Sequence, residues 1–214
     1  TGGGAMHLND ALTRHKKLTP VFFHHEQSAA MAAESYYRLI NKIVVLNVTT
    51  GPGGINALNG VYGAYTDSLS MLVVSGQVKN ETYLKNYKTN LRQLGDQEVD
   101  IVSMVKPITK YAVTVKDPSE IKEIMDKAIY FLRNGRPGPV WVDVPIDVQG
   151  SLIDPNKLKG FDGDIKKLVN DPGVTDNTKL ELTTKSNLND KTFDIIFEKL
   201  KKSSRPVILA GTGV

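Results

Sequence analysis

The stretch that decides the fold is IVVLNVTTGPGGIN, residues 43–56. It opens on a short apolar run, rich in β-branched residues, which is typical of a buried strand. The glycines and the proline that follow predict a tight turn. A helix is then expected from roughly Ile55 to Thr66. A strand that enters a helix through a glycine-rich turn is the building unit of folds with a parallel sheet.

Strands and helices alternate on both sides of this stretch. The other expected helices cover 6–15, 26–40, 98–105 and 118–132, and the other expected strands cover 21–23, 71–74 and 139–145. Apolar residues recur at helical spacing in 26–40, whereas the strands are continuous apolar runs. Continuous apolar strands between helices predict an α/β fold, a three-layer sandwich with a mostly parallel central sheet.

The composition changes after residue 149. Residues 150–190 are rich in Asp, Asn, Lys, Gly and Thr with little periodicity, which predicts an interdomain linker. A helix with one apolar face is expected over 191–201, followed by a strand that runs into Gly211-Thr212-Gly213. We therefore expect a domain over 1–149, a linker over 150–190 and the start of a second α/β domain over 191–214. Both ends look cut, so we expect a piece of a longer protein.

Charge and composition exclude several classes of function. The chain has 27 Lys and Arg against 23 Asp and Glu, a formal net charge of +4. The basic residues form isolated pairs such as Lys166-Lys167, so we expect a solvated surface and no nucleic-acid partner. The absence of cysteine excludes disulfides, thiolate metal sites and cysteine nucleophiles, and it fits a cytoplasmic protein. No apolar run approaches the roughly 20 residues of a membrane helix.

The first candidate site residue is Glu26, in the run His24-His25-Glu26-Gln27 at an expected strand-to-helix boundary. Ligands bind at the carboxyl ends of strands in parallel α/β folds. A zinc-binding HExxH motif is excluded because position 29 is Ala29. A structural role is the alternative, since an acid in a first helical turn gains about 0.3–1 kcal/mol from the helix dipole.

The second candidate is the turn over 49–56, TTGPGGIN. Glycines let the backbone approach a ligand closely. A phosphate-binding loop is excluded because no Lys-Ser/Thr follows the glycines. A dinucleotide-binding turn requires an acid about 20 residues later, where the sequence reads VVSGQ over 73–77. A plain tight turn stays an alternative.

Taken in order, these features resemble one enzyme family. His25-Glu26 precedes the 49–56 turn, then come Asp67 before a strand and Gly76-Gln77-Val78 after it. Further matching segments are 97–98, 108–110 and 135–145. Over residues 1–149 the chain closely resembles the N-terminal, pyrimidine-binding domain of thiamine-diphosphate enzymes of the acetolactate synthase (acetohydroxyacid synthase large subunit) family. Residues 205–211 are similar to the opening of that family's central domain. The resemblance implies a flavodoxin-like domain.

The resemblance also implies a role for Glu26. In the family, the matching glutamate bonds to a nitrogen of the pyrimidine ring and so promotes removal of the thiazolium C2 proton. This role requires a carboxyl group that shares a proton near neutral pH. Apolar neighbours such as Phe22 and Phe23 are expected to raise its pKa.

Other matching residues are implied to contact the cofactor or the substrate. Those expected to bind the cofactor are Gly51, Pro52, Gly53, Asn56, Gly2 and Gly3. Those expected around the substrate channel are Gln77, Gln97 and Lys110.

The rest of the site is expected outside this chain. The family holds the diphosphate through Mg²⁺, bound at a Gly-Asp-Gly…Asn motif in a separate C-terminal domain. Asp162-Gly163-Asp164 has the wrong order and is interpreted as a turn, so we expect no metal ligands here. The turn over 211–213 allows FAD as a further cofactor. The family's site lies between subunits, which implies a homodimer or homotetramer.

The loop after the expected strand 71–74 bears on the reaction. Related pyruvate decarboxylases carry a histidine pair there, whereas this loop reads GQVKN over 76–80. Joining two small 2-keto acids, as acetolactate synthases do, is therefore favoured over simple protonation. Asp96 and Lys79 depart from the family pattern, so a keto-sugar acceptor stays an alternative, as do pyruvate oxidases and oxalyl-CoA lyases. A non-catalytic α/β binding or assembly domain is the alternative of another class.

Overall fold

A parallel sheet forms the centre of the molecule. The computed structural model describes residues 1–184 and 190–211. In this part of the chain the strands are β1 Val44–Val48, β2 Met71–Gln77, β3 Tyr111–Thr114 and β4 Val140–Pro145. They lie in the order β1-β2-β4-β3, and every neighbouring pair is parallel. All six residues of β4 are buried because it is a central strand. The parallel sheet confirms the predicted fold class.

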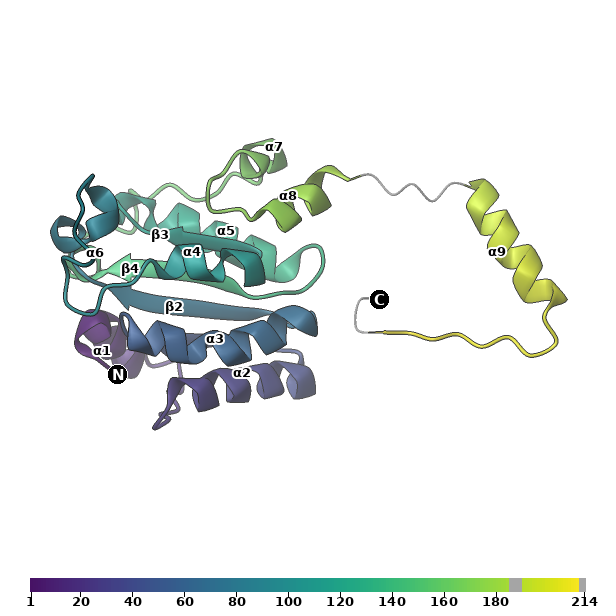
Figure 1. The fold of residues 1–214 in the computed structure, drawn as a ribbon, viewed down its shortest axis with the longest axis horizontal. Coiled ribbons are helices and arrows are strands. Elements are labelled where there is room, and N and C mark those ends of the chain that lie inside the picture. The colour runs from purple at the N-terminus through teal and green to yellow at the C-terminus, as the bar shows by residue number, and fades with distance from the viewer. Residues whose placement is uncertain (185–189, 212–214) are drawn as a thin grey trace.

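Helices cover both faces of the sheet (Figure 1). The helices are α1 Met6–Arg14, α2 Glu26–Ile40, α3 Pro52–Thr66, α4 Ile101–Val105, α5 Ile121–Arg133, α6 Ile146–Gln149, α7 Ile165–Val169, α8 Asp176–Thr183 and α9 Asp190–Lys202. Helices α2, α3 and α4 pack with Val73 and Trp141 on one face. Helix α5 packs with Leu72, Val140 and Val142 on the other. The alternation along β2 and β4 follows from the two-residue period of a strand.

Helices α2 and α3 pack very closely. A Cβ atom added to Gly60 would lie 2.6 Å from the Cβ of Ala30, so only glycine fits at this crossing. Both residues are buried. Helix α2 begins at Glu26, as predicted, and α3 begins at Pro52, earlier than the expected Ile55. Proline suits the first turn of a helix because it has no N–H to leave unpaired there.

Two strand predictions differ from the structure. Residues 21–23 form no strand, and the side chains of Val21, Phe22 and Phe23 are exposed by 71%, 68% and 45%. Conversely, β3 was not expected, and it forms because Tyr111 and Ala112 are buried against β4. A run of three or four apolar residues is too short to reveal which surface will bury it.

The segment predicted as a linker contains two short helices, α7 and α8. Leu168 and Val174 are buried in the core that includes β3 and α5. The N–H of Ala112 donates to the carbonyl oxygen of Gly173 at 2.9 Å, so this segment pairs with the edge strand. The linker boundary at 149 stays a prediction.

The structure of the C-terminal part of the chain agrees only in part with the prediction from the sequence. Helix α9 forms over Asp190–Lys202, close to its expected range, and none of its residues is buried. Residues 206–210 were expected to be a strand but form none, because no described segment pairs with them and Val207 and Leu209 are exposed by 90% and 96%. Thr212 and Gly213 of the expected FAD turn lie outside the described residues. None of the helices in the described ranges is long and apolar enough to cross a membrane.

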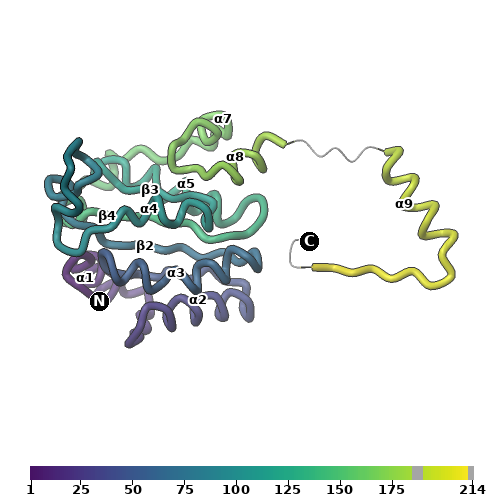
Figure 2. Tube along the Cα trace, in the orientation of Figure 1, coloured from purple at the N-terminus to yellow at the C-terminus, as the bar shows by residue number. Residues whose placement is uncertain are grey.

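Figure 2 follows the path that brings the N-terminus to the site. Residues Gly3–Ala5 form a short 3₁₀ helix, which packs against β2. A Cβ atom added to Gly76 would lie 2.0 Å from the carbonyl oxygen of Gly4, so the two backbones touch at the end of β2. Gln149 Nε2 donates to the same carbonyl at 2.7 Å and fixes the turn from the other side. The N-terminal glycines are thereby held at the edge where the strands end.

Candidate functional site

The candidate site lies at the carboxyl ends of β1 and β2. The chain leaves β1 through Thr49 and Thr50 and turns at Gly51, whose φ of 59° lies in the left-handed region. Gly51 is the N-cap of α3, and Pro52 occupies the first turn of that helix. Helix α2 starts beside it at Glu26. The edge of the sheet at which its strands end is where parallel α/β folds bind ligands.

Glu26 and Asn56 form the polar centre of this site. Asn56 Nδ2 donates a hydrogen bond to Glu26 Oε2 at 3.1 Å. Both residues are half-buried. His25 caps α2, since its Nδ1 accepts from the N–H of Gln27 at 3.1 Å, which orients the start of the helix. One carboxylate oxygen of Glu26 is thus fixed by an amide, while Oε1 faces Gly53, where a Cβ atom would lie 3.5 Å away.

Three glycines leave room around this pair. A Cβ atom on Gly53 would lie 2.8 Å from Thr49 Cγ2, and one on Gly2 would lie 2.5 Å from Thr49 Oγ1. Thr49 therefore lies between the N-terminal turn and the start of α3. A Cβ atom on Gly51 would lie 2.1 Å from the carbonyl oxygen of Gln97, so these two backbones are in direct contact. Gln97 also has a positive φ, 56°.

The structure thus brings most of the predicted cofactor residues together. Those that converge are Gly2, Glu26, Gly51, Gly53 and Asn56, with Gln97 beside them. Pro52 is exposed at the rim, and a Cβ atom on Gly3 would have no atom within 4 Å, so Gly3 faces open space. Phe22 and Phe23, which were expected to surround Glu26, are exposed instead and do not enclose its carboxyl group.

The residues present fit the pyrimidine end of thiamine diphosphate. The glycines form a cradle that a Cβ atom would fill, and the adjoining carboxylate has one oxygen turned toward it. Thr50 Oγ1, next to Gly4, is buried and has no hydrogen-bond partner. A flat ring with polar nitrogens suits such a site, because the backbone approaches the ring face and the carboxylate meets a ring nitrogen.

The metal end of the cofactor has no counterpart in the described residues. Within residues 1–184 and 190–211, no group of three or more His, Cys, Asp or Glu side chains could hold a metal ion. The Asp162 carboxylate accepts from the N–H of Asp164 and closes a local turn, and the Asp164 carboxylate accepts from the N–H of Lys166 and caps α7. The interpretation of this string as a turn is confirmed.

Gln77, expected in the substrate channel, lies inside the protein. Its side chain is buried, with 1% exposure. Nε2 donates to the carbonyl of Val99 at 3.0 Å and to Asp143 Oδ2 at 3.1 Å, and Oε1 accepts from the N–H of Val78 at 3.0 Å. Every hydrogen-bonding group of this amide therefore has a protein partner. In this structure Gln77 is a buried residue that connects β2 with β4 and with the backbone at Val99, and its place in the substrate channel stays a prediction.

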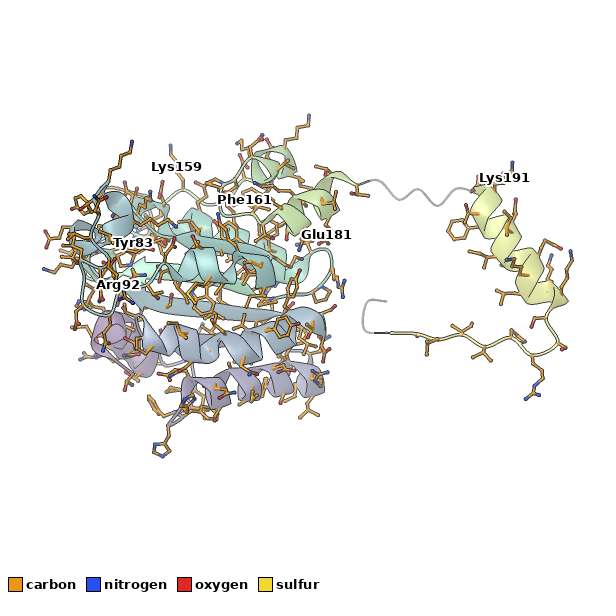
Figure 3. The ribbon with its side chains drawn as sticks, viewed as in Figure 1. Tyr83, Arg92, Lys159, Phe161, Glu181 and Lys191 are labelled. Carbon is orange, nitrogen blue, oxygen red and sulfur yellow. The ribbon has the colours of Figure 1, made fainter. Side chains whose placement is uncertain are left out.

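Lys110, also expected in the channel, lies at the opposite edge of the sheet. It precedes β3, whereas Glu26 and the Gly51 turn lie where strands end. Figure 3 shows the two edges: Tyr83 and Arg92 lie where β2 and β4 end, and Glu181 lies at the other edge. Lys110 is therefore not part of the Glu26 site, and its assignment to the substrate channel stays a prediction.

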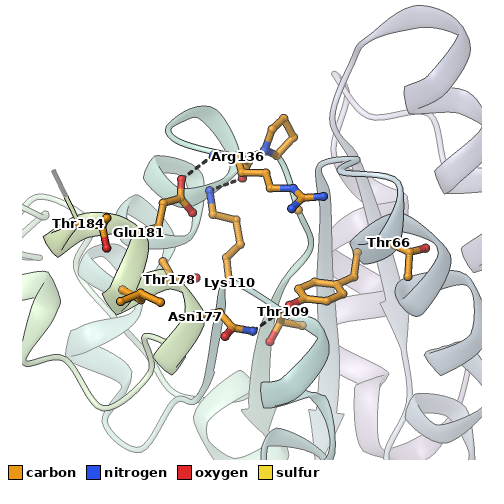
Figure 4. A pocket seen from close by; sticks show the side chains of 12 residues that line it. Thr66, Thr109, Lys110, Arg136, Asn177, Thr178, Glu181 and Thr184 are labelled. Carbon is orange, nitrogen blue, oxygen red and sulfur yellow. Dashed lines mark hydrogen bonds between the residues drawn. The ribbon is translucent and has the colours of Figure 1, made fainter. Parts of the chain in front are cut away.

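The surroundings of Lys110 explain its position. Its Nζ donates to the carbonyl oxygens of Asn134 and Arg136, at 2.6 Å each, and so closes the turn that follows α5. Figure 4 shows the bond to Arg136. Burial lowers the pKa of Lys110, and Glu181 opposes this effect. An open cavity of ≈ 770 Å³, lined by Lys110, Arg136 and Asn177 among others, adjoins this turn. Lysine is favourable at a helix C-terminus because it meets unpaired carbonyl oxygens there.

Asp143 is the residue that sequence reasoning missed. It is fully buried in β4, and its carboxyl group accepts from Ser75 Oγ at 2.6 Å, Gln77 Nε2 at 3.1 Å and Thr114 Oγ1 at 3.3 Å. Burial raises the pKa of Asp143 to about 7, although these three hydrogen bonds oppose it. The sequence did contain a signal for this residue, since one acid stands inside the apolar run VWVDVP. An acid in a buried strand requires hydrogen-bond partners, and such a network can be sought from the sequence.

Comparison with known proteins agrees with this geometry. Residues 1–104 match the family described as "Thiamine pyrophosphate enzyme, N-terminal TPP binding domain", thiamine pyrophosphate being another name for thiamine diphosphate. The acetolactate synthase large subunit of Lactococcus lactis subsp. lactis is 33% identical over 213 residues, which are 100% of this chain and 33% of that protein.

Two further relatives are similar to the chain. The acetolactate synthase large subunit of Buchnera aphidicola subsp. Acyrthosiphon pisum is 33% identical over 213 residues, covering 100% of this chain and 34% of that protein. The chloroplastic acetolactate synthase of Arabidopsis thaliana is 31% identical over 220 residues, covering 99% of this chain and 28% of that protein. The chain spans about a third of the length of these relatives. By its fold, its glutamate–glycine site and these matches, the chain belongs to the thiamine-pyrophosphate enzymes of the acetolactate synthase family, as an N-terminal cofactor-binding domain.

Proposed function

We propose that this chain is the pyrimidine-binding part of a thiamine-diphosphate enzyme that cleaves one 2-keto acid and joins the product to a second keto acid. The observation that carries the proposal is the Glu26 carboxylate, oriented by Asn56 and turned toward Gly53 at the end of a parallel strand. Its relatives named acetolactate synthase support this choice of reaction. A non-catalytic assembly domain would not require an acid held in this way.

Each residue of the site has a task in this proposal. Bound thiamine diphosphate would supply a nucleophilic thiazolium carbon for reaction at the keto group. Asn56 holds Glu26 Oε2, which leaves Oε1 to hold or release a proton at a pyrimidine nitrogen. Gly51 and Gly53 would let the ring approach the backbone, and Gly2 and Gly3 are proposed to lie beside the thiazolium. These residues bind and orient the ring, and Glu26 manages the proton.

The proposal places the diphosphate and its Mg²⁺ on residues outside those described. No cluster of metal-binding side chains exists in the described ranges, and a second domain or polypeptide must then supply the ligands. FAD is proposed as a further cofactor, at the turn over 211–213.

A second copy of the chain is proposed as a partner, in a homodimer or homotetramer with the site between subunits. Large apolar side chains are exposed around the start of α2 and on α3. Val21 and Phe22 are exposed by 71% and 68%, Met31 by 43% and Ile55 by 43%. An apolar surface next to a half-buried carboxylate supports coverage by another subunit. Covering Phe22 and Phe23 would also supply the apolar surroundings that Glu26 lacks in the single chain.

The substrate is proposed to be a small 2-keto acid. Lys79 and Asp96 lie in the loop after β2 and are exposed, and Lys79 forms an ion pair with Glu81 at 3.3 Å. Two charged residues at this position support a keto-sugar as the alternative acceptor. The proposed location is cytoplasmic, without nucleic-acid or membrane partners, in line with a composition that lacks cysteine and has scattered charges.

One assay tests the reaction. The whole enzyme is incubated with pyruvate, thiamine diphosphate and Mg²⁺, and the products are identified by mass spectrometry. Acetolactate supports the proposal. Acetaldehyde as the only product would indicate simple decarboxylation, and acetate as the only product would indicate oxidation, so either would contradict the proposed joining reaction. A branched sugar, formed when a keto-sugar is added, would support the alternative acceptor. Loss of product in Glu26→Gln, with retention in the matched surface variant Glu120→Gln, ties the activity to this site.

A further inference from the structure

The buried carboxyl group of Asp143 belongs to a continuous chain of hydrogen bonds. Trp141 Nε1 donates to Ser75 Oγ at 2.8 Å, and Ser75 Oγ donates to Asp143 Oδ1 at 2.6 Å. On the other side, Oδ2 accepts from Gln77 Nε2 and from Thr114 Oγ1. Asp143 is 0% exposed and Gln77 is 1% exposed, so both side chains are shielded from water. Three strands, β2, β4 and β3, are joined at their ends by one carboxyl group.

Gln77 links this hydrogen-bond chain to a segment outside the sheet. Its Oε1 accepts from the N–H of Val78, so its orientation is fixed and both Nε2 hydrogens point at acceptors. One hydrogen goes to Asp143, and the other goes to the carbonyl oxygen of Val99 at 3.0 Å. Val99 belongs to the segment 95–100, which leads into α4. The hydrogen bond to Asp143 orients the Gln77 amide, and this amide in turn fixes the position of the 95–100 segment at Val99.

The segment 95–100 reaches the cofactor turn directly. The Glu98 carboxylate accepts from the N–H groups of Gly95 and Leu84, which closes the segment into a compact turn. At its tip the carbonyl oxygen of Gln97 touches the backbone of Gly51, within 2.1 Å of a Cβ position there. Gly51 starts α3, on which Asn56 holds Glu26. The contacts run without a gap from Asp143 to the Glu26 site.

We propose that Asp143 is a positioning residue that, through Gln77, holds the 95–100 segment against the Gly51 turn and so sets the geometry of the pyrimidine site. The inference rests on the proposed function of Glu26. Asp143 contacts no cofactor and acts only through the residues named. What it supplies is an acceptor at the Oδ2 position, since that oxygen receives Gln77.

The chemistry of the network separates two substitutions. In Asp143→Asn, the new amide nitrogen can face Ser75 Oγ, which has a free lone pair, while the amide oxygen still receives Gln77 and Thr114. In Asp143→Leu, a side chain of similar size removes the acceptor altogether. Gln77→Met removes the same link from the other end with little change of volume.

The test measures cofactor saturation in the whole enzyme. Asp143→Leu and Gln77→Met are each expected to raise the half-saturating thiamine diphosphate concentration by about tenfold or more, as expected for a buried polar group left without its partner. Asp143→Asn is expected to stay within about threefold of the wild type, because the acceptor is retained. Hydrogen exchange of the 95–99 amides, followed by mass spectrometry, should accelerate in the first two variants and not in the third.

Asp171→Asn is the matched control. Asp171 is also a largely buried acid, with 11% side-chain exposure, and it pairs with Lys127 at 2.7 Å far from the Glu26 site. It is expected to lower stability without changing cofactor saturation or exchange at 95–99. If Asp143→Leu does not fold, Gln77→Met decides the question alone.

Unchanged saturation and exchange in the folded Gln77→Met enzyme would overturn the inference. An equal effect of Asp171→Asn would overturn it too, because general destabilisation would then explain the result. A wild-type enzyme with no thiamine diphosphate dependence would instead overturn the proposed function, while the exchange measurement would still report on the hydrogen-bond chain.

Discussion

Replacing Lys110 with methionine is expected to weaken the fold and to leave substrate binding unchanged. Lys110 is 5% exposed, and its ammonium group donates to two carbonyl oxygens at 2.6 Å. Methionine matches the length of the aliphatic stem but leaves the carbonyl oxygens of Asn134 and Arg136 without this donor. The turn after α5 therefore loses its closing contact.

The size of the effect follows from the two bonds. A hydrogen bond from a charged donor contributes about 1.5–3 kcal/mol, and removing it leaves the acceptor unpaired. Methionine carries no charge, so the variant does not incur the free-energy cost of burying an ammonium group, and this offsets part of the loss. The lowered pKa of Lys110 reflects that cost. A net loss of about 2–4 kcal/mol in the free energy of unfolding is the balance of these terms. With about 2 kcal/mol per molar urea, the unfolding midpoint falls by about 1–2 M.

The assay is urea unfolding of the 214-residue chain, followed by the fluorescence of its single tryptophan, Trp141, which is fully buried. Lys122→Met serves as a control, because Lys122 is an exposed residue of α5 and its replacement should change the midpoint very little. In the whole enzyme, the KM for the keto acid should be the same in Lys110→Met and wild type. An unchanged midpoint combined with a raised KM would refute the reasoning and return Lys110 to the substrate channel.

Three further outcomes are expected. Glu26→Gln should lower turnover and exchange of the thiazolium C2 proton by about 10²–10⁴-fold, measured by proton NMR of bound cofactor, and near-normal exchange would contradict its role. Gly51→Ala should impair both urea stability and cofactor saturation, because φ is 59° and the new Cβ would meet the carbonyl of Gln97, whereas Gly3→Ala in open space should fold as the wild type does. Asp143 keeps its proton up to about pH 7 in the folded chain but only to pH 3.8 when unfolded, so the folded chain binds one more proton between these values. The free energy of unfolding should therefore fall by on the order of 4 kcal/mol as pH rises through this window, and Asp143→Asn should remove this dependence, as pH-resolved urea titrations would show.

Much of the fold could be predicted because its elements are long and periodic. The bounds of α2 and the position of β4 follow from apolar spacing and from a continuous apolar run. The prediction of a strand at Phe22 and Phe23 was wrong. A run of three apolar residues does not reveal whether the same chain or another chain will cover it. The strand β3 was missed for the same reason, and its four residues are recognisable only beside β4.

The candidate site was predictable where residues follow strands. Glu26, Gly51 and Asn56 converge because β1 ends at one edge of the sheet and the helices start there. The edge of the sheet at which Lys110 lies could not be predicted, since it depends on β3, which was not expected. Gln77 and Asp143 depend on contacts between strands, and one-dimensional spacing does not encode which buried groups meet.

The crossing of α2 and α3 has a consequence for how this protein can vary. Glu26 and Asn56 each lie one helical turn ahead of the residues that touch there, Ala30 and Gly60. Widening the crossing by the thickness of a methyl group would carry the 3.1 Å bond between Glu26 and Asn56 past the reach of a hydrogen bond. Selection for turnover would then act on position 60, although Gly60 takes no part in the reaction. Such selection would remove every residue other than glycine at this position.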